Sequence, residues 1–493
     1  MKLEEIQQRL KAAAADPRAF MKQRPQKWDE AGNPAPEQSA FSPVDIERKR
    51  FIAGGDDVRR SIFAVEDGVV VALEDVLPGR APFESNDRAE NLVDTLSHRT
   101  LEAMDAAGLK AARLAENPWS DDYWAICTGQ LGKRYADRNF PTSLEWEAAH
   151  HYVLDHTAAD IVASGDAAAI DALSPAEKYD LLVGDTAFTL TRYMWEQGRY
   201  YFEKNGEVET WMGICHGWAP ASYMLGRPLA PVTVAAADGQ TRITFHPADI
   251  KALASQLWAR SRTVSKFIGG RCNDKDPAED ANGRVTSPRC FDTNPGTWHL
   301  AVVNQIGVSK RSFVIDATYD YEVWNQPVVA YAYDLFHPVT RAVGSPSETI
   351  VPIGQLGEDR FKPYRSANAA YVVGVHMRLS YIAETNPRHQ QADGPENDRV
   401  RTVEYIYDLE LDANRQIIGG EWHQQAHPDF LWTPPAGVKA ISPADRFSPG
   451  TWASGTVPFL WRVAARNGAS QGLPLARVVE ALISRARRPD LVG

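Results

Sequence analysis

The spacing of apolar positions divides the chain into a helical first part and a strand-rich second part. Over residues 90–205 apolar side chains recur about every 3.6 positions, most clearly over residues 144–163, as in an amphipathic helix. Residues 1–23 have the same period and predict one amino-terminal helix. Ser174-Pro175-Ala176-Glu177 predicts a helix start, because a serine cap, a first-turn proline and a glutamate three positions on suit the free amides there.

After Trp211 the pattern changes to short runs typical of strands. Residues 232–236 and 241–245 are joined through Asp238-Gly239, a hairpin dipeptide, and a similar pair is expected over residues 61–73, turning at Asp67-Gly68. The other predicted strands are residues 298–304, 312–315, 328–333, 371–381, 403–411 and 416–422. Helices are expected at residues 216–224, 247–260 and 475–487. Helices followed by an antiparallel sheet indicate an α+β fold.

Length and composition refine this picture. With 493 residues, the chain exceeds the size at which one core stops growing. We expect an amino-terminal helix with a Pro-rich arm (1–46), a mainly helical region (47–205), an α+β core (206–435) and a Pro-rich tail ending in a helix (436–493). Hydrophobic residues make up 44% and charged residues 24%, as in ordinary globular proteins.

The charge and the amino terminus bear on partners and location. The net charge of -11 argues against nucleic-acid binding, which needs a basic surface. No apolar run approaches the roughly 20 residues that span a bilayer. Residues 1–11 lack the apolar segment of a secretory signal, so the sequence alone predicts a cytoplasmic protein.

One of the four cysteines has the surroundings of a nucleophile. Cys215 follows Gly213-Ile214 and stands where the helix at residues 216–224 begins. A helix amino terminus favours a thiolate, and its free N–H groups, with the amide of Cys215, can stabilise an oxyanion. We therefore expect Cys215 to carry out acyl transfer.

A thiol nucleophile needs a base and a group that orients the base. His299 lies in the predicted strand 298–304, and Asp316 ends the next predicted strand. A hairpin between these strands would place the two side chains together. The sequence therefore predicts a Cys215–His299–Asp316 triad, with Asp320 as the reserve acid.

Three short motifs resemble those of known transglutaminases. Gly213-Ile214-Cys215, with Ala219 after three further residues, resembles the nucleophile motif of the transglutaminase-like superfamily, which shares the papain-like core. Ile315-Asp316-Ala317-Thr318 resembles its hydrophobic-Asp-X-Thr strand end. Residues 323–328 (Val-Trp-Asn-Gln-Pro-Val) resemble the start of the Pep-13 elicitor segment of oomycete cell-wall transglutaminases. The chain is thus similar to the transglutaminase elicitor family, strongly over residues 170–340.

This resemblance implies a protein-glutamine gamma-glutamyltransferase. Cys215 would form a thioester with a peptidyl glutamine, and a lysine, another primary amine or water would accept the acyl group. The partners would be glutamine-bearing and lysine-bearing proteins or small amines, and the family context implies secretion. Residues 329–333 lack the basic residue of the elicitor peptide, so elicitor activity is not carried over. Two alternatives stay open: a papain-like cysteine peptidase or amidase, and a non-catalytic recognition protein.

The loop between residues 269 and 295 offers two further features. Cys272 and Cys290 bracket an acidic stretch, and a disulfide there would stabilise the fold by roughly 3 kcal/mol if the protein matures in an oxidising compartment. No cofactor is required by the expected chemistry. Because the family has calcium-stimulated members, Asp274, Asp276 and Asp280 are candidate calcium ligands, although their spacing fits no EF-hand and suits a solvated acidic loop better.

Overall fold

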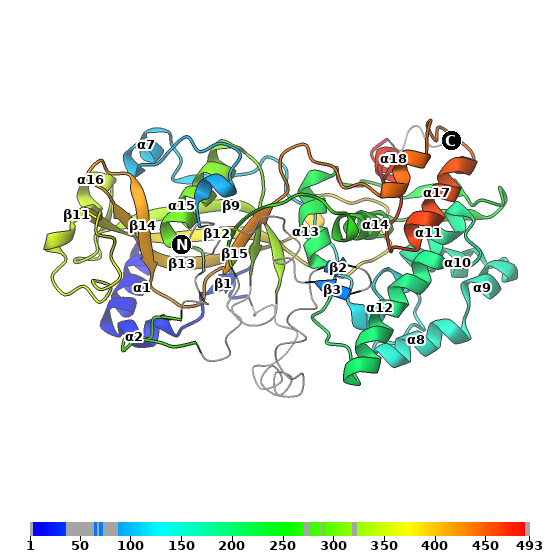
Figure 1. Ribbon diagram of the computed structural model, residues 1–493, viewed down its shortest axis with the longest axis horizontal. Coiled ribbons are helices and arrows are strands. Elements are labelled where there is room, and N and C mark those ends of the chain that lie inside the picture. The colour runs from blue at the N-terminus through cyan, green and yellow to red at the C-terminus, as the bar shows by residue number, and fades with distance from the viewer. Residues whose placement is uncertain are drawn as a thin grey trace.

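The computed structural model describes residues 3–35, 64–66, 69–71, 87–270, 277–287, 290, 292–317 and 323–488. Figure 1 shows a part dominated by a sheet beside a part dominated by helices, with α13 (Cys215–Met224) between them. The predicted α+β class is confirmed. The amino terminus lies against the sheet, and the carboxy-terminal helices lie in the helical part.

Most of the described strands form one large antiparallel sheet in the order β1-β13-β12-β9-β8-β15-β7. Its long central strands are β9 (Asn325–Phe336), β12 (Tyr371–Ala383) and β13 (Arg399–Leu411). The other strands on this path are β1 (Lys27–Trp28), β8 (Val314–Asp316), β15 (Phe430–Thr433) and β7 (Lys266–Gly269). The strands β4 (Ala111–Arg113), β10 (Val343–Gly344), β11 (Val351–Pro352) and β14 (Ile417–Trp422) pair with the central three.

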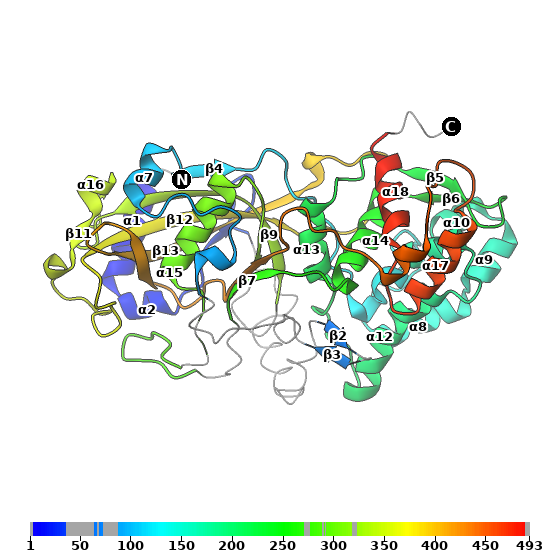
Figure 2. The same cartoon turned by 45° about the horizontal axis from the view of Figure 1, so that its top comes forward.

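Helices cover both faces of this sheet. Because side chains alternate along a strand, Tyr405 and Ile406 of β13 point to opposite faces. The helix α15 (Pro295–Val302) packs on one face, where Trp298 meets the Tyr405 ring edge-on at 5.3 Å. The helix α1 (Leu3–Ala15) packs on the other, where Leu10 and Ile406 share an apolar cluster. Figure 2 shows α15 lying over the central strands. Coverage of both faces explains why consecutive side chains of β12 and β13 are buried.

The helical part is built mainly from the middle and the end of the chain. Its elements are α8 (Trp146–Asp155), α9 (Ala158–Ser164), α10 (Ala167–Asp171), α11 (Pro175–Val183), α12 (Thr189–Asn205), α14 (Pro247–Arg260), α17 (Phe459–Ala469) and α18 (Ala476–Ala486), with the hairpin β5 (Val232–Ala235) and β6 (Arg242–Phe245). The predicted cap of α11 is confirmed, since Ser174 and Glu177 form a capping box. Smaller elements are α2 (Pro17–Met21), α7 (Leu101–Ala106), α16 (Pro346–Thr349) and the pair β2 (Ala64–Glu66) and β3 (Val69–Val71).

Two predicted elements are wrong. The amino-terminal helix is broken into α1 and α2, because Pro17 cannot continue a helix and Asp16 caps the second one through the Ala19 amide. Residues 298–304 are not a strand: they belong to α15 and to the π-helical turn Val303–Val308 that follows it. The turn residues Asp67 and Gly68 of the confirmed β2–β3 pair lie outside the described residues.

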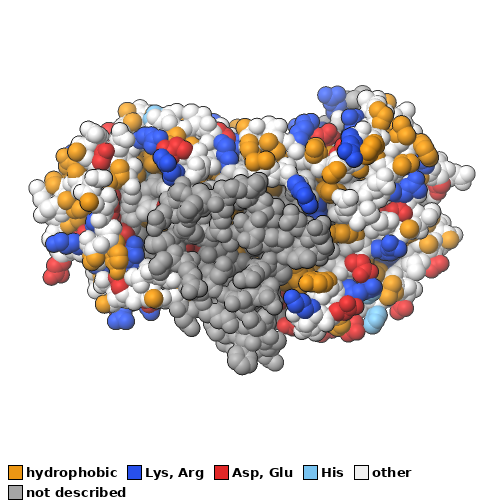
Figure 3. Space-filling view, in the orientation of Figure 1, with side chains coloured by type: hydrophobic (Ala, Val, Ile, Leu, Met, Phe, Trp, Pro, Cys, Tyr) orange, Lys and Arg blue, Asp and Glu red, His pale blue; other side chains and the backbone are white. Residues whose placement is uncertain are grey.

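The described surface carries charges of both signs. In the view of Figure 3, Lys and Arg side chains are interspersed with Asp and Glu over the sheet part and the helical part. Among the described helices, none is long and apolar enough to cross a bilayer.

Candidate active site

Cys215 is the first residue of α13, where the chain passes very close to another segment. The Ile214 amide donates a hydrogen bond to the Tyr123 carbonyl at 2.7 Å, and a Cβ on Gly213 would lie 2.3 Å from that same oxygen. A Cβ on Gly217 would lie 2.2 Å from the Ser255 carbonyl of α14. The glycines therefore allow a backbone approach that fixes where the thiol stands.

Two groups of the segment before and at the start of β9 contact the Cys215 sulfur. The thiol donates to the Val323 carbonyl at 3.6 Å, and the Asn325 side-chain amide donates to the sulfur at 3.5 Å. The Trp432 indole N–H donates to Asn325 Oδ1 at 2.8 Å. Because an indole nitrogen can only donate, this contact fixes the amide orientation and turns its NH₂ group towards the sulfur.

Asp316 lies beside this group, and not beside His299 as the predicted hairpin requires. It ends β8 and pairs across the sheet with Asn325. Its carboxylate accepts a hydrogen bond from the Trp324 amide at 3.1 Å. Its negative charge also acts on the Cys215 thiol, whose pKa it helps to raise. The structure therefore brings Cys215 and Asp316 into one site.

A second carboxyl acts on the thiol from the next strand. Glu384 directly follows β12, is buried, and accepts a hydrogen bond from the Gln326 amide. Burial raises the pKa of Glu384 to about 7, and the charge of Asp122 adds to this effect. A carboxyl with a pKa near neutrality can both accept and return a proton.

The thiol itself is held in its protonated form. Burial raises the pKa of Cys215 to about 11; the Asn325 hydrogen bonds oppose this rise, and the Glu384 and Asp316 charges add to it. A buried thiol with such a pKa is unreactive while it keeps its proton. To act as a nucleophile it would need a base to remove that proton.

The structure does not bring His299 to this site. His299 lies on α15, buried, with Nδ1 2.8 Å from the Tyr407 hydroxyl and its ring 4.7 Å from the ring of Tyr333. Tyr333 and Asn325 are eight residues apart on β9, or about 26 Å at 3.3 Å per residue. The imidazole and the Cys215 sulfur are therefore at least about 10 Å apart.

A local signal explains why His299 is on a helix. Asn294 accepts a hydrogen bond from the Gly296 amide, and Pro295 occupies the first helical position. This is a strong helix start, whereas a short apolar run fits a buried strand and a buried helix equally well. Burial then lowers the pKa of His299 to about 3, which keeps the imidazole neutral.

The loop candidates have a mixed outcome. Cys290 is disulfide-bonded, while Cys127 and Cys215 are in no disulfide. Cys272 lies outside the described residues, so the predicted pairing stays a prediction. The same holds for Asp274, Asp276 and the reserve acid Asp320, which also fall outside them.

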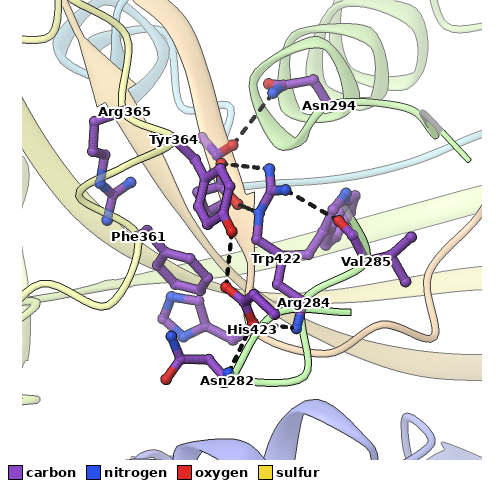
Figure 4. A network of polar contacts seen from close by, with 12 residues as sticks. Asn282, Arg284, Val285, Asn294, Phe361, Tyr364, Arg365, Trp422 and His423 are labelled. Atoms are coloured by element: carbon purple, nitrogen blue, oxygen red, sulfur yellow. Dashed lines mark hydrogen bonds and ion pairs between the residues drawn. The ribbon is translucent and has the colours of Figure 1, made fainter. Parts of the chain in front are cut away.

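Asp280 is the one calcium candidate among the described residues, and its oxygens already accept hydrogen bonds. The amides of Asn282 and Arg284 donate to Oδ1 at 2.8 and 3.0 Å, and the Tyr364 hydroxyl donates to Oδ2 at 3.0 Å. Figure 4 shows the surrounding network, in which the Arg284 guanidinium lies against the Tyr364 ring. In this arrangement Asp280 stabilises a turn.

Four site residues have no predicted role: Asn325, Gln326, Glu384 and Trp432. Asn325 and Gln326 belong to the Pep-13-like hexapeptide, so the motif that carries the resemblance lies, buried, at the cysteine. Their membership of this motif is the sequence signal that could have identified Asn325 and Gln326 as site residues. Glu384 and Trp432 belong to distant strands, and no local motif marks them.

Comparisons with known proteins agree with the fold and the motifs. Residues 93–442 match the family model described as transglutaminase elicitor. The crystal structure of the GP42 transglutaminase from Phytophthora sojae is similar, with a TM-score of 0.50 and 22% sequence identity; the match covers 79% of this chain and 93% of that one. No curated protein matches.

Proposed function

The chain belongs to the transglutaminase elicitor family, and from this premise we propose that it is a protein-glutamine gamma-glutamyltransferase whose nucleophile is Cys215. The observation that carries this proposal is the arrangement at the start of α13. There a free thiol contacts a fixed amide donor and is subject to the charges of two carboxyls. A nucleophile, a base and an oxyanion donor are the parts that acyl transfer needs.

The first half of the reaction forms a thioester. The ionised Glu384 carboxylate takes the thiol proton as the Cys215 sulfur attacks the carboxamide carbon of a peptidyl glutamine. The carbonyl oxygen becomes an oxyanion. Glu384 then gives its proton to the amide nitrogen, the C–N bond breaks, and ammonia leaves.

The second half transfers the acyl group. A lysine amine or another primary amine attacks the thioester carbon, and Glu384 takes the proton that the amine loses. The C–S bond breaks, and that proton returns to the sulfur of Cys215. The product is an isopeptide bond between a glutamine-bearing and a lysine-bearing protein, and water in place of the amine would give deamidation.

Asn325 is the proposed oxyanion donor, together with the backbone amide of Cys215. Its NH₂ group already donates to the sulfur, and Trp432 prevents the amide from turning over. A donor held in place before the reaction costs no reorganisation when charge develops on the substrate oxygen. Asp316 positions the start of β9 through the Trp324 amide.

The proposal is tested by offering the full chain a glutamine-rich protein and a fluorescent primary amine. We expect the amine to become covalently attached to the protein, with one ammonia released per amine incorporated. The C215A variant should lose both signals. The matched control is C127A, which removes the other described cysteine that is in no disulfide and should keep both signals.

Other outcomes decide between the remaining classes. Backbone cleavage that depends on Cys215, without amine incorporation, would indicate a peptidase and contradict the transferase. Wild-type protein that gives neither reaction would support a non-catalytic recognition protein. Full incorporation by C215A would refute the assignment of the nucleophile.

A further inference from the structure

Three side chains from separate segments converge where the connection between β12 and β13 meets the helical part. Asp171 ends α10, His246 immediately precedes α14, and His389 lies in the connection between β12 and β13. His246 Nε2 is 3.1 Å from Asp171 Oδ1, and His389 Nδ1 is 3.4 Å from Asp171 Oδ2. One ligand atom from each residue lies within 4.8 Å of the other two. The carboxylate thus stands between two imidazole nitrogens.

These distances suit a shared metal ion. Zinc binds imidazole nitrogen and carboxylate oxygen at about 2.0–2.2 Å, which separates neighbouring ligand atoms of a tetrahedral site by about 3.4 Å. Both nitrogen–oxygen distances are close to this value. The two imidazole rings are stacked with centroids 3.7 Å apart and planes 10° from parallel, so both present their edges to the same carboxylate. Because an imidazole nitrogen binds a metal in the plane of its ring, one of the two rings must turn out of this stack for both nitrogens to reach one ion.

The ligands are held in place by a buried network. The His246 backbone amide donates to Asp249 at 2.8 Å, and Asp249 forms a fully buried ion pair with Lys178 at 2.7 Å. Tyr135 donates its hydroxyl to Asp249 and meets the His389 ring edge-on. The Lys178 charge near the imidazoles is therefore balanced by Asp249. The network positions the backbone of His246 and contacts the ring of His389.

We propose that Asp171, His246 and His389 bind a divalent transition metal, with zinc as the best match. Two imidazoles and one carboxylate are a zinc-type donor set, whereas calcium takes oxygen ligands. The His246 side chain is 4% exposed, but Asp171 and His389 are 37% and 26% exposed. The open side leaves a fourth position for water.

The metal would join the two parts of the molecule. Asp171 and His246 belong to the helical part, while His389 belongs to a connection that leaves the sheet at Glu384. A bound ion would fasten this connection five residues after the carboxyl that acts on Cys215. The site is separate from the cysteine, so its occupancy can be measured without any assay of acyl transfer.

The test is a titration of the metal-free full chain with Zn²⁺, followed by calorimetry and by competition with a chromophoric chelator. We expect one zinc per chain and a rise in melting temperature. H389A and D171N each lose a ligand, so their zinc affinity should fall by more than the roughly 10–100-fold that loss of a supporting contact costs. Zinc should not raise the melting temperature of either variant. The control H151A removes an exposed histidine of α8 and should behave as wild type.

Two results would overturn the proposal. One is wild-type protein that binds no stoichiometric zinc, which would make the cluster a hydrogen-bonded His–Asp group only. The other is H389A that binds zinc as tightly as wild type. Co²⁺ provides an independent readout, because a four-coordinate site gives intense visible absorption bands that H389A should lack. H389A and wild type should melt at similar temperatures in EDTA, which separates metal loss from misfolding.

Discussion

Two buried regions along β9 contain titratable groups that the sequence assigns to one site. The cysteine site consists of Cys215, Asp316, Val323, Asn325 and Glu384, and lies at the first residues of β9. The histidine pocket consists of His299, Tyr333, Met377 and Tyr407, and lies near the other end of that strand. Both are buried, yet only the first combines a thiol with charged groups.

The difference follows from position in the sheet. At strand ends the chain leaves the ladder, so polar side chains and free carbonyls from several strands can meet. The cysteine site draws on the ends of β8, β9 and β12. In the interior of a covered sheet a side chain meets only its cross-strand and facing neighbours. The histidine pocket is accordingly aromatic, and burial keeps its imidazole neutral.

The largest expected effect comes from removing the base of the cysteine site. E384Q keeps the shape and the contact with Gln326 but cannot take a proton. We expect kcat for amine incorporation to fall by about 10²–10⁴-fold. In wild type, kcat/KM should rise as the pH increases through about 7, where Glu384 ionises. That inflection should be absent from the E384Q profile.

Stability provides a second readout of the same variant. The pKa of Glu384 is raised from 4.5 to about 7 in the folded protein, so the unfolded chain releases this proton at lower pH. The stability that this group contributes is complete below about pH 4.5 and is lost as the pH rises through 7. E384Q should remove this loss. The control E396Q, an exposed glutamate of the same connection, should change neither profile, and an E384Q enzyme with wild-type rates would exclude Glu384 as the base.

Asn325 should have the next largest effect. N325A removes the amide donor at the sulfur, and a lost oxyanion donor costs about 10²–10³-fold in kcat. W432F keeps Asn325 but removes the N–H that fixes it, and we expect about a tenfold loss, the worth of one ordinary hydrogen bond. Steady-state kinetics of amine incorporation measures both. Equal losses in the two variants would mean that Trp432 supports the fold instead of orienting the amide.

Much of this molecule follows from local sequence signals. Residues 247–260 form α14 as predicted, because proline at the first position marks its start. The hairpin β5–β6 forms on either side of Asp238-Gly239. Cys215 begins a helix as predicted. In each case the residues that determine the element lie within a few positions of one another, so the local sequence is enough to predict it.

The wrong or missing predictions arise where a residue is positioned by a contact distant in the sequence, or where a pattern fits both a helix and a strand. The run around His299 is apolar at nearly every position, and only Asn294-Pro295 distinguishes a helix from a strand. Glu384 lies at the cysteine site because β12 is next to β9 in the sheet. The order of strands in a sheet cannot be predicted from the local spacing of residues. Because His299 lies on α15 and not on a strand beside Cys215, the predicted triad lacks its histidine.

The smallest expected effect on catalysis, and therefore the sharpest test of the comparison, lies in the histidine pocket. H299Q disturbs the contact with the Tyr407 hydroxyl, and a buried polar group left poorly paired costs about 1–3 kcal/mol. We expect urea unfolding to show this loss, while kcat/KM per folded molecule stays close to wild type. Y407F, which removes the other partner, should give a similar pattern.

The pH dependence distinguishes this structural role from a catalytic one. Because burial lowers the pKa of His299 from 6.5 to about 3, its contribution to stability is present above pH 6.5 and is lost as the pH falls towards 3. The stability difference between wild type and H299Q should therefore shrink on acidification. If H299Q is folded but lacks amine incorporation as completely as C215A does, the histidine pocket would belong to the catalytic site. The separation along β9 argues against that result, because no proton can pass directly between groups at least about 10 Å apart.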